Sequence, residues 1–225
     1  MNGLEQTHEP SSARLIVTLG LCGLISGVVL VGVFLLTEPR IQRNRAEALQ
    51  AAILRVLPGA ERSDAWVLRG DVLQPYAGES GTIPDEPAVF AGYDAAGSLV
   101  GYAVPADGPG FMDTIKLIYG YDPSRRVIVG MQVLDSRETP GLGDKIITDD
   151  EFLANFEALA IEPSMVTVKK GKKVNPNEVD SITGATISSE AVVKILNESS
   201  QQWAPMLSQQ EETSEVSRNV PRAEP

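Results

Sequence analysis

Histidine and cysteine are almost absent from this chain of 225 residues. The sequence holds one histidine, His8, in a polar N-terminal stretch, and one cysteine, Cys22, inside an apolar run. This scarcity excludes a Ser-His-Asp triad and a zinc site built from Cys and His. It also excludes a self-contained iron–sulfur cluster, which needs about four thiolates, and a c-type haem, which needs a Cys-x-x-Cys-His string. We therefore expect no catalytic residue and no metal site, and any redox carrier must be organic.

Positive charge is also scarce. The chain has 19 Lys and Arg against 30 Asp and Glu, a formal net charge of −11, which argues against a nucleic-acid partner because phosphate backbones are bound by net basic surfaces. One basic cluster exists at residues 169–173, Lys-Lys-Gly-Lys-Lys. We predict a solvated hairpin tip between residues 165–168 and 174–177, with a docking patch as the alternative.

One long run near the N-terminus carries no charge at all. It extends from Leu15 through Thr37, and at about 1.5 Å per residue it reaches roughly 34 Å, enough to cross a hydrocarbon core of about 30 Å. A cleaved signal peptide is the alternative, but its apolar region is usually only about 7–15 residues long. We predict a tail at residues 1–14 and a single transmembrane helix at residues 15–37, anchored in a lipid bilayer.

The remaining sequence predicts an α+β domain. Helical spacing at residues 40–57 stops at Pro58-Gly59, a helix-ending pair. Extended segments are predicted at residues 65–73, 88–93, 98–104, 114–121 and 126–134. This pattern favours antiparallel strands with flanking helices over a regular βαβ alternation.

Two further helices and the domain limits follow from local signals. A capping box from Thr148 to Glu151 predicts a helix through about residue 159. The run at residues 187–196 predicts another, with Ile187, Ala191 and Ile195 on one face and Ser188 or Ser189 as the cap. We predict a juxtamembrane helix at residues 38–59, one domain at residues 60–205 and a disordered acidic tail at residues 206–225.

Residues 180–186 read Asp-Ser-Ile-Thr-Gly-Ala-Thr and place a hydroxyl, that of Thr186, directly before the last predicted helix. The free N–H groups and the positive dipole end of such a helix favour an anion, so a phosphate carried by Thr186 would be stabilised there. An ordinary loop ending in a helix start is the alternative.

The string Asp-x-x-Thr-Gly-Ala-Thr resembles the flavinylation motif of FMN-binding domains in membrane redox complexes. Gly-Pro-Gly-Phe at residues 108–111, Glu-Thr-Pro-Gly-Leu-Gly-Asp-Lys at residues 138–145 and the apolar anchor extend the likeness along the chain. Together they are similar to the G-subunit family of Rnf-type electron transport complexes, with the C-subunit family of the sodium-pumping NADH:quinone oxidoreductase as a near relative. The resemblance implies FMN bound covalently to Thr186 by a phosphoester, made by a separate flavin transferase.

The resemblance also implies further cofactor-binding residues. From the motif these are Asp180, Thr183, Gly184 and Ala185, and from the loop they are Thr139, Gly141, Leu142 and Gly143. The small residues leave room at the hydroxyl, the loop glycines permit close backbone approach to the ring, the leucine packs on a ring face, and the threonine reaches a ring edge. A tight turn is the alternative for the loop, Phe111 is expected to close the core, and Asp180 either orients backbone N–H groups or assists the transferase.

The function implied is that of a flavoprotein component, an electron carrier rather than a stand-alone enzyme, in a complex that links NADH and ferredoxin and translocates ions. Its partners would be the other membrane and redox subunits. The alternatives are the C-subunit family of the quinone oxidoreductase and a cofactor-free, membrane-anchored binding or scaffold domain.

The implied location is the bacterial inner membrane, with the soluble domain on the periplasmic face. The flanking charges argue the other way. Only Arg14 precedes the apolar run, whereas Arg40, Arg43 and Arg45 follow it, and positive charge is normally retained on the cytoplasmic side. Large domains can nevertheless translocate regardless of such charges.

Overall fold

The structure is a computed structural model that describes residues 12–70, 72–76, 84 and 86–219. Of the tail predicted at residues 1–14, residues 1–11, with His8, lie outside the described residues, as do the final residues 220–225, whereas residues 12–14 are already helical. The chain divides into two compact units, Met1–Ala46 and Glu47–Pro225. Every β-strand among the described residues lies in the second unit, and the strands and helices confirm the α+β class.

The first unit contains most of helix α1, Ser12–Val56. By length and composition this helix can cross a membrane, and none of its apolar window is buried within the structure. The span predicted at residues 15–37 lies within it, and the juxtamembrane helix predicted at residues 38–59 is not separate but continues the same helix as far as Val56, with Pro39 inside it. As predicted, the helix stops before Pro58-Gly59, where Gly59 has a φ of +95°, which a glycine adopts at little cost.

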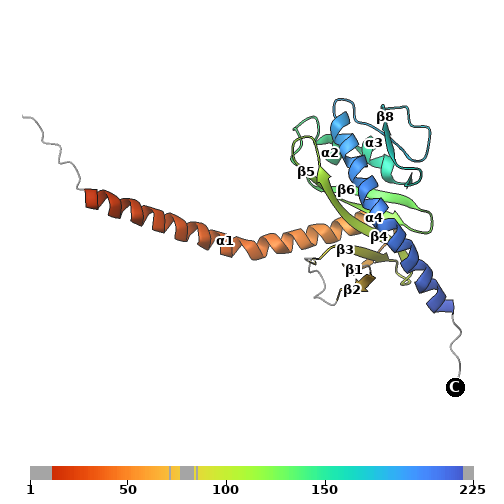
Figure 1. Ribbon diagram of the computed structural model, residues 1–225, viewed down its shortest axis with the longest axis horizontal. Helices are drawn as coiled ribbons and strands as arrows, with labels where there is room; N and C mark the ends of the chain where they lie inside the picture. Colours follow the sequence, from red (N-terminus) through yellow and green to blue (C-terminus); the bar gives the residue numbers. More distant parts are fainter. Residues whose placement is uncertain (1–11, 71, 77–83, 85, 220–225) are drawn as a thin grey trace, which may run out of the picture. The chain divides into compact units, whose positions relative to one another are not determined.

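Seven strands form one antiparallel sheet in the order β2-β1-β3-β4-β5-β6-β7 (Figure 1). Their bounds are β1 Arg62–Arg69, β2 Val72–Pro75, β3 Ala88–Tyr93, β4 Leu99–Pro109, β5 Thr114–Asp122, β6 Val127–Asp135 and β7 Leu159–Ala160. The strands predicted at residues 88–93, 114–121 and 126–134 are confirmed within one residue or so. The segment predicted at residues 65–73 is instead a hairpin, because Gly70, with a φ of +65°, turns the chain between β1 and β2.

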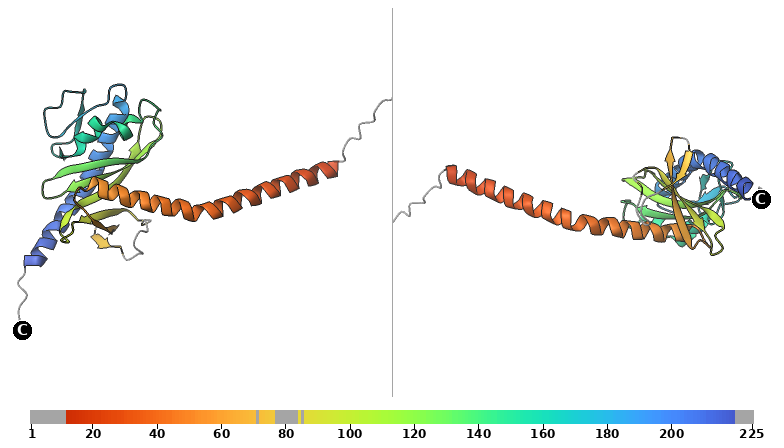
Figure 2. Two further views of the ribbon diagram at one scale, coloured as in Figure 1. Left: turned by 180° about the vertical axis from the view of Figure 1, so that it is seen from behind. Right: turned by 90° about the horizontal axis from the view of Figure 1, so that it is seen from below.

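The two faces of the sheet carry different hydrophobic clusters. Val104, Leu117 and Tyr119 point to one face and pack with α4, Thr186–Asn219, whereas Ala103 and Ile118, alternating with them, point to the other. That second face packs against the last turns of α1, which belong to the same unit as the sheet. The views from behind and below show α4 and the last turns of α1 on opposite sides of the strands (Figure 2).

Helix α4 is tied to the sheet by a polar contact as well as by its apolar face. The hydroxyl oxygens of Tyr119 on β5 and Ser199 on α4 lie 3.0 Å apart and share a hydrogen bond. Burial raises the pKa of the Tyr119 phenol, so this group stays neutral and available as a donor. The contact adds a polar link between β5 and α4 to their apolar packing.

The start and buried face of α4 differ from the prediction. The helix begins at Thr186, so Ser188 and Ser189 lie in its first turn and are not caps. Of the three residues predicted on one buried face, Ile187 is exposed, whereas Ile195 is buried and Ala191 packs partly buried against the core; the other buried residues of this stretch are Val192, Val193 and Leu196.

The end of α4 also differs. A disordered tail was predicted from residue 206, but α4 continues through Asn219. Trp203, Ala204 and Leu207 are buried in the core at helical spacing, and these contacts favour helix past residue 206 despite the polar composition that follows.

The segment between β6 and α4 is less regular than predicted. The single helix predicted from Thr148 to residue 159 is three short pieces, α2 Lys145–Thr148, α3 Asp150–Leu153 and η1 Ala154–Phe156. The capping residue is Asp149, whose side chain accepts a hydrogen bond from the N–H of Phe152 at 3.0 Å, so the predicted cap is one residue too early.

The lysine cluster lies between parallel strands and not at a hairpin tip. Strands β8, Val166–Val168, and β9, Glu178–Asp180, pair in parallel. The hairpin prediction is therefore wrong, because parallel strands need a connection that returns the chain to the same end. Residues 169–177 form the connection between β8 and β9, and we call this segment the lysine loop.

The close approach of α1 to the sheet generates a stability prediction. A Cβ atom at Gly120 would lie 1.9 Å from the carbonyl oxygen of Val56, and one at Gly130 would lie 2.9 Å from the same atom. We expect Gly120→Ala to lower the free energy of unfolding by about 2–3 kcal/mol, because backbone and not a flexible side chain must move. Denaturant unfolding of the detergent-solubilised protein, followed by tryptophan fluorescence, measures the loss. Gly130→Ala should cost less, and equal stability of Gly120→Ala and the unchanged protein would contradict the packing.

Candidate functional site

The hydroxyl-bearing residue singled out by the motif stands at the first position of α4. Thr186 is exposed, while its neighbour Ala185 is buried at 5% exposure. The first N–H groups of an α-helix have no partner within the helix, and the helix dipole places positive potential at the same end. The oxygen of Thr186 is thus accessible from solvent at a position that stabilises negative charge.

The loop before Thr186 is held in shape from inside α4. The side-chain oxygen of Ser189, which is fully buried, accepts from the N–H of Ile182 at 3.1 Å and donates to the carbonyl of Ala185 at 3.0 Å. Gly184 has a φ of +84°, in the left-handed region that favours glycine. The chain therefore turns sharply at Gly184 and presents Thr183 and Gly184 to solvent.

The glycine-rich loop of residues 138–145 lies beside this turn. A Cβ atom at Gly184 would have the Leu142 side chain as its neighbour, at 3.8 Å. The tight turn offered as the alternative is present, since the carbonyl of Thr139 accepts from the N–H of Leu142 at 3.1 Å and Gly141 has a φ of +76°. The same turn brings Leu142, which is 48% exposed, against the motif loop.

Glu138, at the head of that loop, is buried at 5% exposure and connects three segments. Its Oε1 accepts from the N–H groups of Phe111 at 2.9 Å and Met112 at 3.1 Å. Its Oε2 accepts from the hydroxyl of Ser188 in α4 at 2.6 Å. One carboxyl group therefore joins the segment after β4, the glycine-rich loop and the first turn of α4.

The glycines of residues 108–111 are required by close contacts. A Cβ atom at Gly108 would lie 2.7 Å from Cγ1 of Ile195 in α4, and one at Gly110 would lie 2.4 Å from Oε1 of Glu138. Phe111 was expected to close the core, but it is 58% exposed. The reason is that its backbone faces inward, toward Glu138, which directs the ring to the surface.

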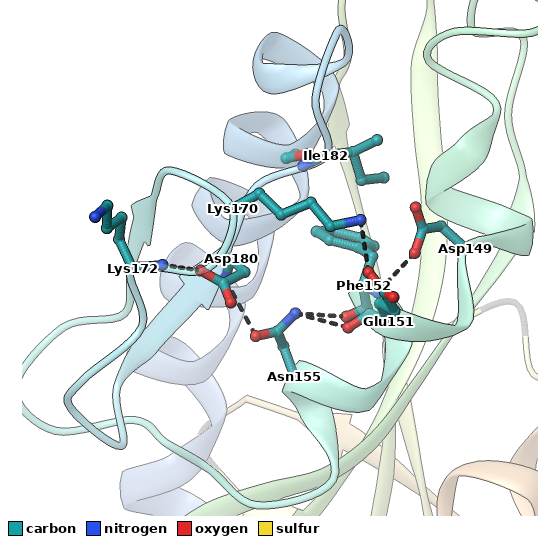
Figure 3. Close-up of polar contacts among 9 residues, drawn as sticks. Asp149, Glu151, Phe152, Asn155, Lys170, Lys172, Asp180 and Ile182 are labelled. Carbon is teal, nitrogen blue, oxygen red and sulfur yellow. Dashed lines mark hydrogen bonds and ion pairs between the residues drawn. The ribbon is translucent and has the colours of Figure 1, made fainter.

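Asp180 acts on the lysine loop and not on the loop that leads to Thr186. Its Oδ1 accepts from the N–H groups of Lys172 at 3.1 Å and Lys173 at 3.2 Å (Figure 3). Its own N–H donates to the side-chain oxygen of Asn155 at 3.1 Å. Of the two roles proposed from the sequence, the orienting of backbone N–H groups is thus present, at a different loop than expected.

A cavity of about 270 Å³ opens between the lysine loop and the helices that follow β6 (Figure 3). It is lined by Asp149, Glu151, Phe152, Lys170, Gly171, Asp180, Ser181 and Ile182. Lys170 forms an ion pair with Glu151 beside it. The cavity is smaller than the roughly 300–1,000 Å³ of sites that bury a whole ligand.

The residues around Thr186 fit a phosphate joined to a flat apolar ring. Leu142, which lies beside Gly184, and Ile187, which follows Thr186, both have exposed apolar side chains. A Cβ atom at Gly141 would have no neighbour within 4 Å, so the loop is open on that side. Oδ1 of Asp144, in the glycine-rich loop, is buried without a hydrogen-bond partner among the described residues.

The sequence singled out Thr186 and its two loops, but it did not identify the residues that join them. Ser188 and Ser189 were considered only as caps, and Glu138 only as part of a loop. Gly143 was expected to permit close approach of the backbone to a ring, but it is buried and faces other protein groups. A Cβ atom there would lie 2.8 Å from both Oε2 of Glu138 and Oγ of Ser188. A glutamate placed directly before a Gly-rich loop is the only local signal of such a contact.

Comparisons with known proteins agree with this arrangement. The profile of the FMN-binding domain family matches residues 110–201, which include both loops and the start of α4. The G subunit of the ion-translocating oxidoreductase complex of Methanosarcina acetivorans is 31% identical over 186 residues, which are 82% of this chain and 90% of that protein. The G subunit of the proton-translocating ferredoxin:NAD(+) oxidoreductase complex of Clostridium ljungdahlii is 28% identical, over 79% of this chain and 84% of that one.

A solved structure supports the fold. The crystal structure of the C subunit of the Na(+)-translocating NADH-quinone reductase from Parabacteroides distasonis superposes with a TM-score of 0.59 over 75% of this chain and 94% of that one, at 22% identity. At this identity the likeness concerns the fold alone.

The contacts of Asp180 generate a local prediction. We expect Asp180→Ala to increase amide hydrogen exchange strongly at Lys173, whose N–H group loses its acceptor, and less at Lys172, whose N–H group also donates to the carbonyl of Lys169 at 2.9 Å. The free energy of unfolding should fall by about 1–2 kcal/mol. Nuclear magnetic resonance measures the exchange residue by residue. The matched control is Glu178→Ala, which removes the acceptor of Val174 and Asn175 in the same loop. Unchanged exchange at both lysines, or an equal effect of the control on them, would refute the assignment.

Proposed function

The chain belongs to the family of G subunits of ion-translocating oxidoreductase complexes, and we propose that it carries FMN covalently on Thr186 and passes electrons within such a complex. The observation that carries the proposal is the exposed hydroxyl of Thr186 at the first turn of α4, at the last position of the flavinylation motif. The family membership follows from the relative that is 31% identical over 90% of its length. When bound, the flavin supplies the electron-transfer chemistry, and the protein holds and orients it.

The attachment would be a phosphoester between Oγ of Thr186 and the phosphorus of FMN. Its formation releases the hydroxyl proton and expels the leaving group of an activated flavin nucleotide, which a separate flavin transferase supplies. Ala185 and Gly184 leave the hydroxyl accessible to that enzyme, and Thr183 lies exposed beside them. The N-terminal end of α4 favours the negative phosphate once it is attached.

The ring would be held by the glycine-rich loop. Leu142 lies beside Gly184 and exposes about half of its surface, so it can pack on a ring face next to the attachment point. Thr139 and Gly141 shape the turn that presents Leu142, and Gly143 lets the loop approach Ser188. A flavin ring is a flat apolar system with polar edges, which these groups match.

The larger assembly is proposed from the relatives. One of them is named as part of a ferredoxin:NAD(+) oxidoreductase complex, and we propose the same electron pair, linked to ion translocation, for the complex that includes this chain. Its partners are the other membrane and redox subunits, and the flavin transferase acts during maturation. The acidic chain and the wholly exposed apolar window of α1 fit a bilayer-anchored electron carrier.

The orientation we propose places the domain at residues 60–205 on the periplasmic face of the bacterial inner membrane. A Cys22→Ala variant provides a cysteine-free background, into which Lys116→Cys places a thiol on an exposed position of β5. A membrane-impermeant reagent should label this variant in intact cells. The control is Ser12→Cys, which lies before the apolar run and should be labelled only after lysis; the reverse pattern would place the domain in the cytoplasm.

The covalent bond has a direct test. The protein coexpressed with a flavin transferase, denatured and separated on a gel, should fluoresce under ultraviolet light. Thr186→Val should lose essentially all of this signal, since valine keeps the shape of threonine but has no hydroxyl, and Thr186→Ser should retain it. The matched control is Thr114→Val, an exposed threonine at the start of β5. A dark wild-type band with an active transferase, or a fluorescent Thr186→Val band, would refute the proposal.

A further inference from the structure

We propose that Glu138 is the positioning residue of the flavin site. The length of its side chain sets where the segment at residues 110–112 and the glycine-rich loop at residues 138–145 lie relative to Thr186. This inference rests on the proposed function, because it concerns a flavin attached to that threonine. It adds a residue that lies outside the motif string and whose role cannot be read from the motif.

The hydrogen bonds of Glu138 identify it as a connector. All three bonds to its carboxyl group are donated to it, two by the N–H groups of Phe111 and Met112 and one by the hydroxyl of Ser188. An ionised carboxylate accepts and does not donate, and bonds to it are roughly twice as strong as neutral ones. At 5% exposure this group is almost out of contact with water, so the three donors replace most of its hydration.

The backbone around Glu138 is built to admit its side chain. Gly110 and Gly143 come from different segments, and a Cβ atom on either would lie within 3 Å of a carboxylate oxygen of Glu138. A glycine at both places lets the two segments close on the carboxylate. The space is therefore specific for a side chain of this length, and a shorter acid cannot reach both sets of donors.

Ser188 links Glu138 to the part of α4 that carries Thr186. Ser188 is two residues after Thr186, in the same first turn of α4, and Leu142 is four residues after Glu138 and lies beside Gly184. Helix α4 is fixed independently through its buried face and the contact between Tyr119 and Ser199. Loss of the Glu138 hydrogen bonds would therefore displace the segment at residues 110–112 and the glycine-rich loop, while Thr186 stays in place.

Two substitutions separate the effect of the length of the Glu138 side chain from the effect of its charge. Glu138→Asp keeps the carboxylate but shortens it by one methylene, whereas Glu138→Gln keeps the length and an oxygen acceptor but removes the charge. In protein made without a transferase, we expect amide exchange of Phe111 and Met112 to be about tenfold faster in Glu138→Asp, the effect of losing one strong hydrogen bond. Glu138→Gln should show a smaller change and so act as the conservative rescue.

The flavin itself provides the second measurement. In protein coexpressed with a transferase, Glu138→Asp should keep the fluorescent gel band, because Thr186 is untouched, while the native protein shows lower flavin fluorescence anisotropy and shifted flavin absorption bands. Ile53→Val, which lies on the opposite face of the sheet, is the control for general destabilisation and should leave both optical signals at their wild-type values.

The outcomes distinguish the two proposals. A dark wild-type band refutes the proposed function and this inference with it. A fluorescent wild type together with a folded Glu138→Asp variant that keeps wild-type exchange, anisotropy and absorption refutes the inference alone. An equal loss of anisotropy in Ile53→Val would also overturn it, because the effect would then follow stability and not the position of Glu138.

Discussion

The buried carboxyl group of Glu138 places a strict condition on the site, since its hydrogen bonds form only when three segments distant in sequence come together. Two donors follow β4, the third is in α4, and the acceptor begins the glycine-rich loop. A buried polar group left without partners costs several kcal/mol, so partial assembly of this region is unfavourable. The loops therefore reach their positions beside Thr186 together with α4.

The sheet provides the rigid base for this arrangement. Its two faces are covered by α4 and by the last turns of α1, and glycines let both helices approach the strands closely. A redox group carried at the start of a long helix that is packed along a sheet has little freedom to move at its point of attachment. Under the proposed function, the loops would then shape the surroundings of the flavin ring without altering its attachment at Thr186.

Local features were predictable from the sequence, and contacts between distant segments were not. The strand at residues 88–93, the helix end at Pro58-Gly59 and the exposed Thr186 follow from alternation, turn chemistry and helix-start signals within a few residues. The parallel pairing of β8 with β9 and the inward-facing backbone at Phe111 depend on partners at least ten residues away. For Glu138, the glycine-rich loop that it begins could be identified from the sequence. Its hydrogen bond to Ser188 could not, because the two residues are 50 positions apart.

The central claim, an FMN ester at one named oxygen, is tested most directly by peptide mass spectrometry. Trypsin cleaves after Lys173 and Lys194, and no Lys or Arg lies between these two residues, so residues 174–194 should be released as one peptide. In protein matured with a flavin transferase, this peptide should gain the mass of FMN less one water, and fragmentation should assign the gain to Thr186. An unmodified peptide, or a gain assigned to Ser181, Thr183, Ser188 or Ser189, would contradict the account.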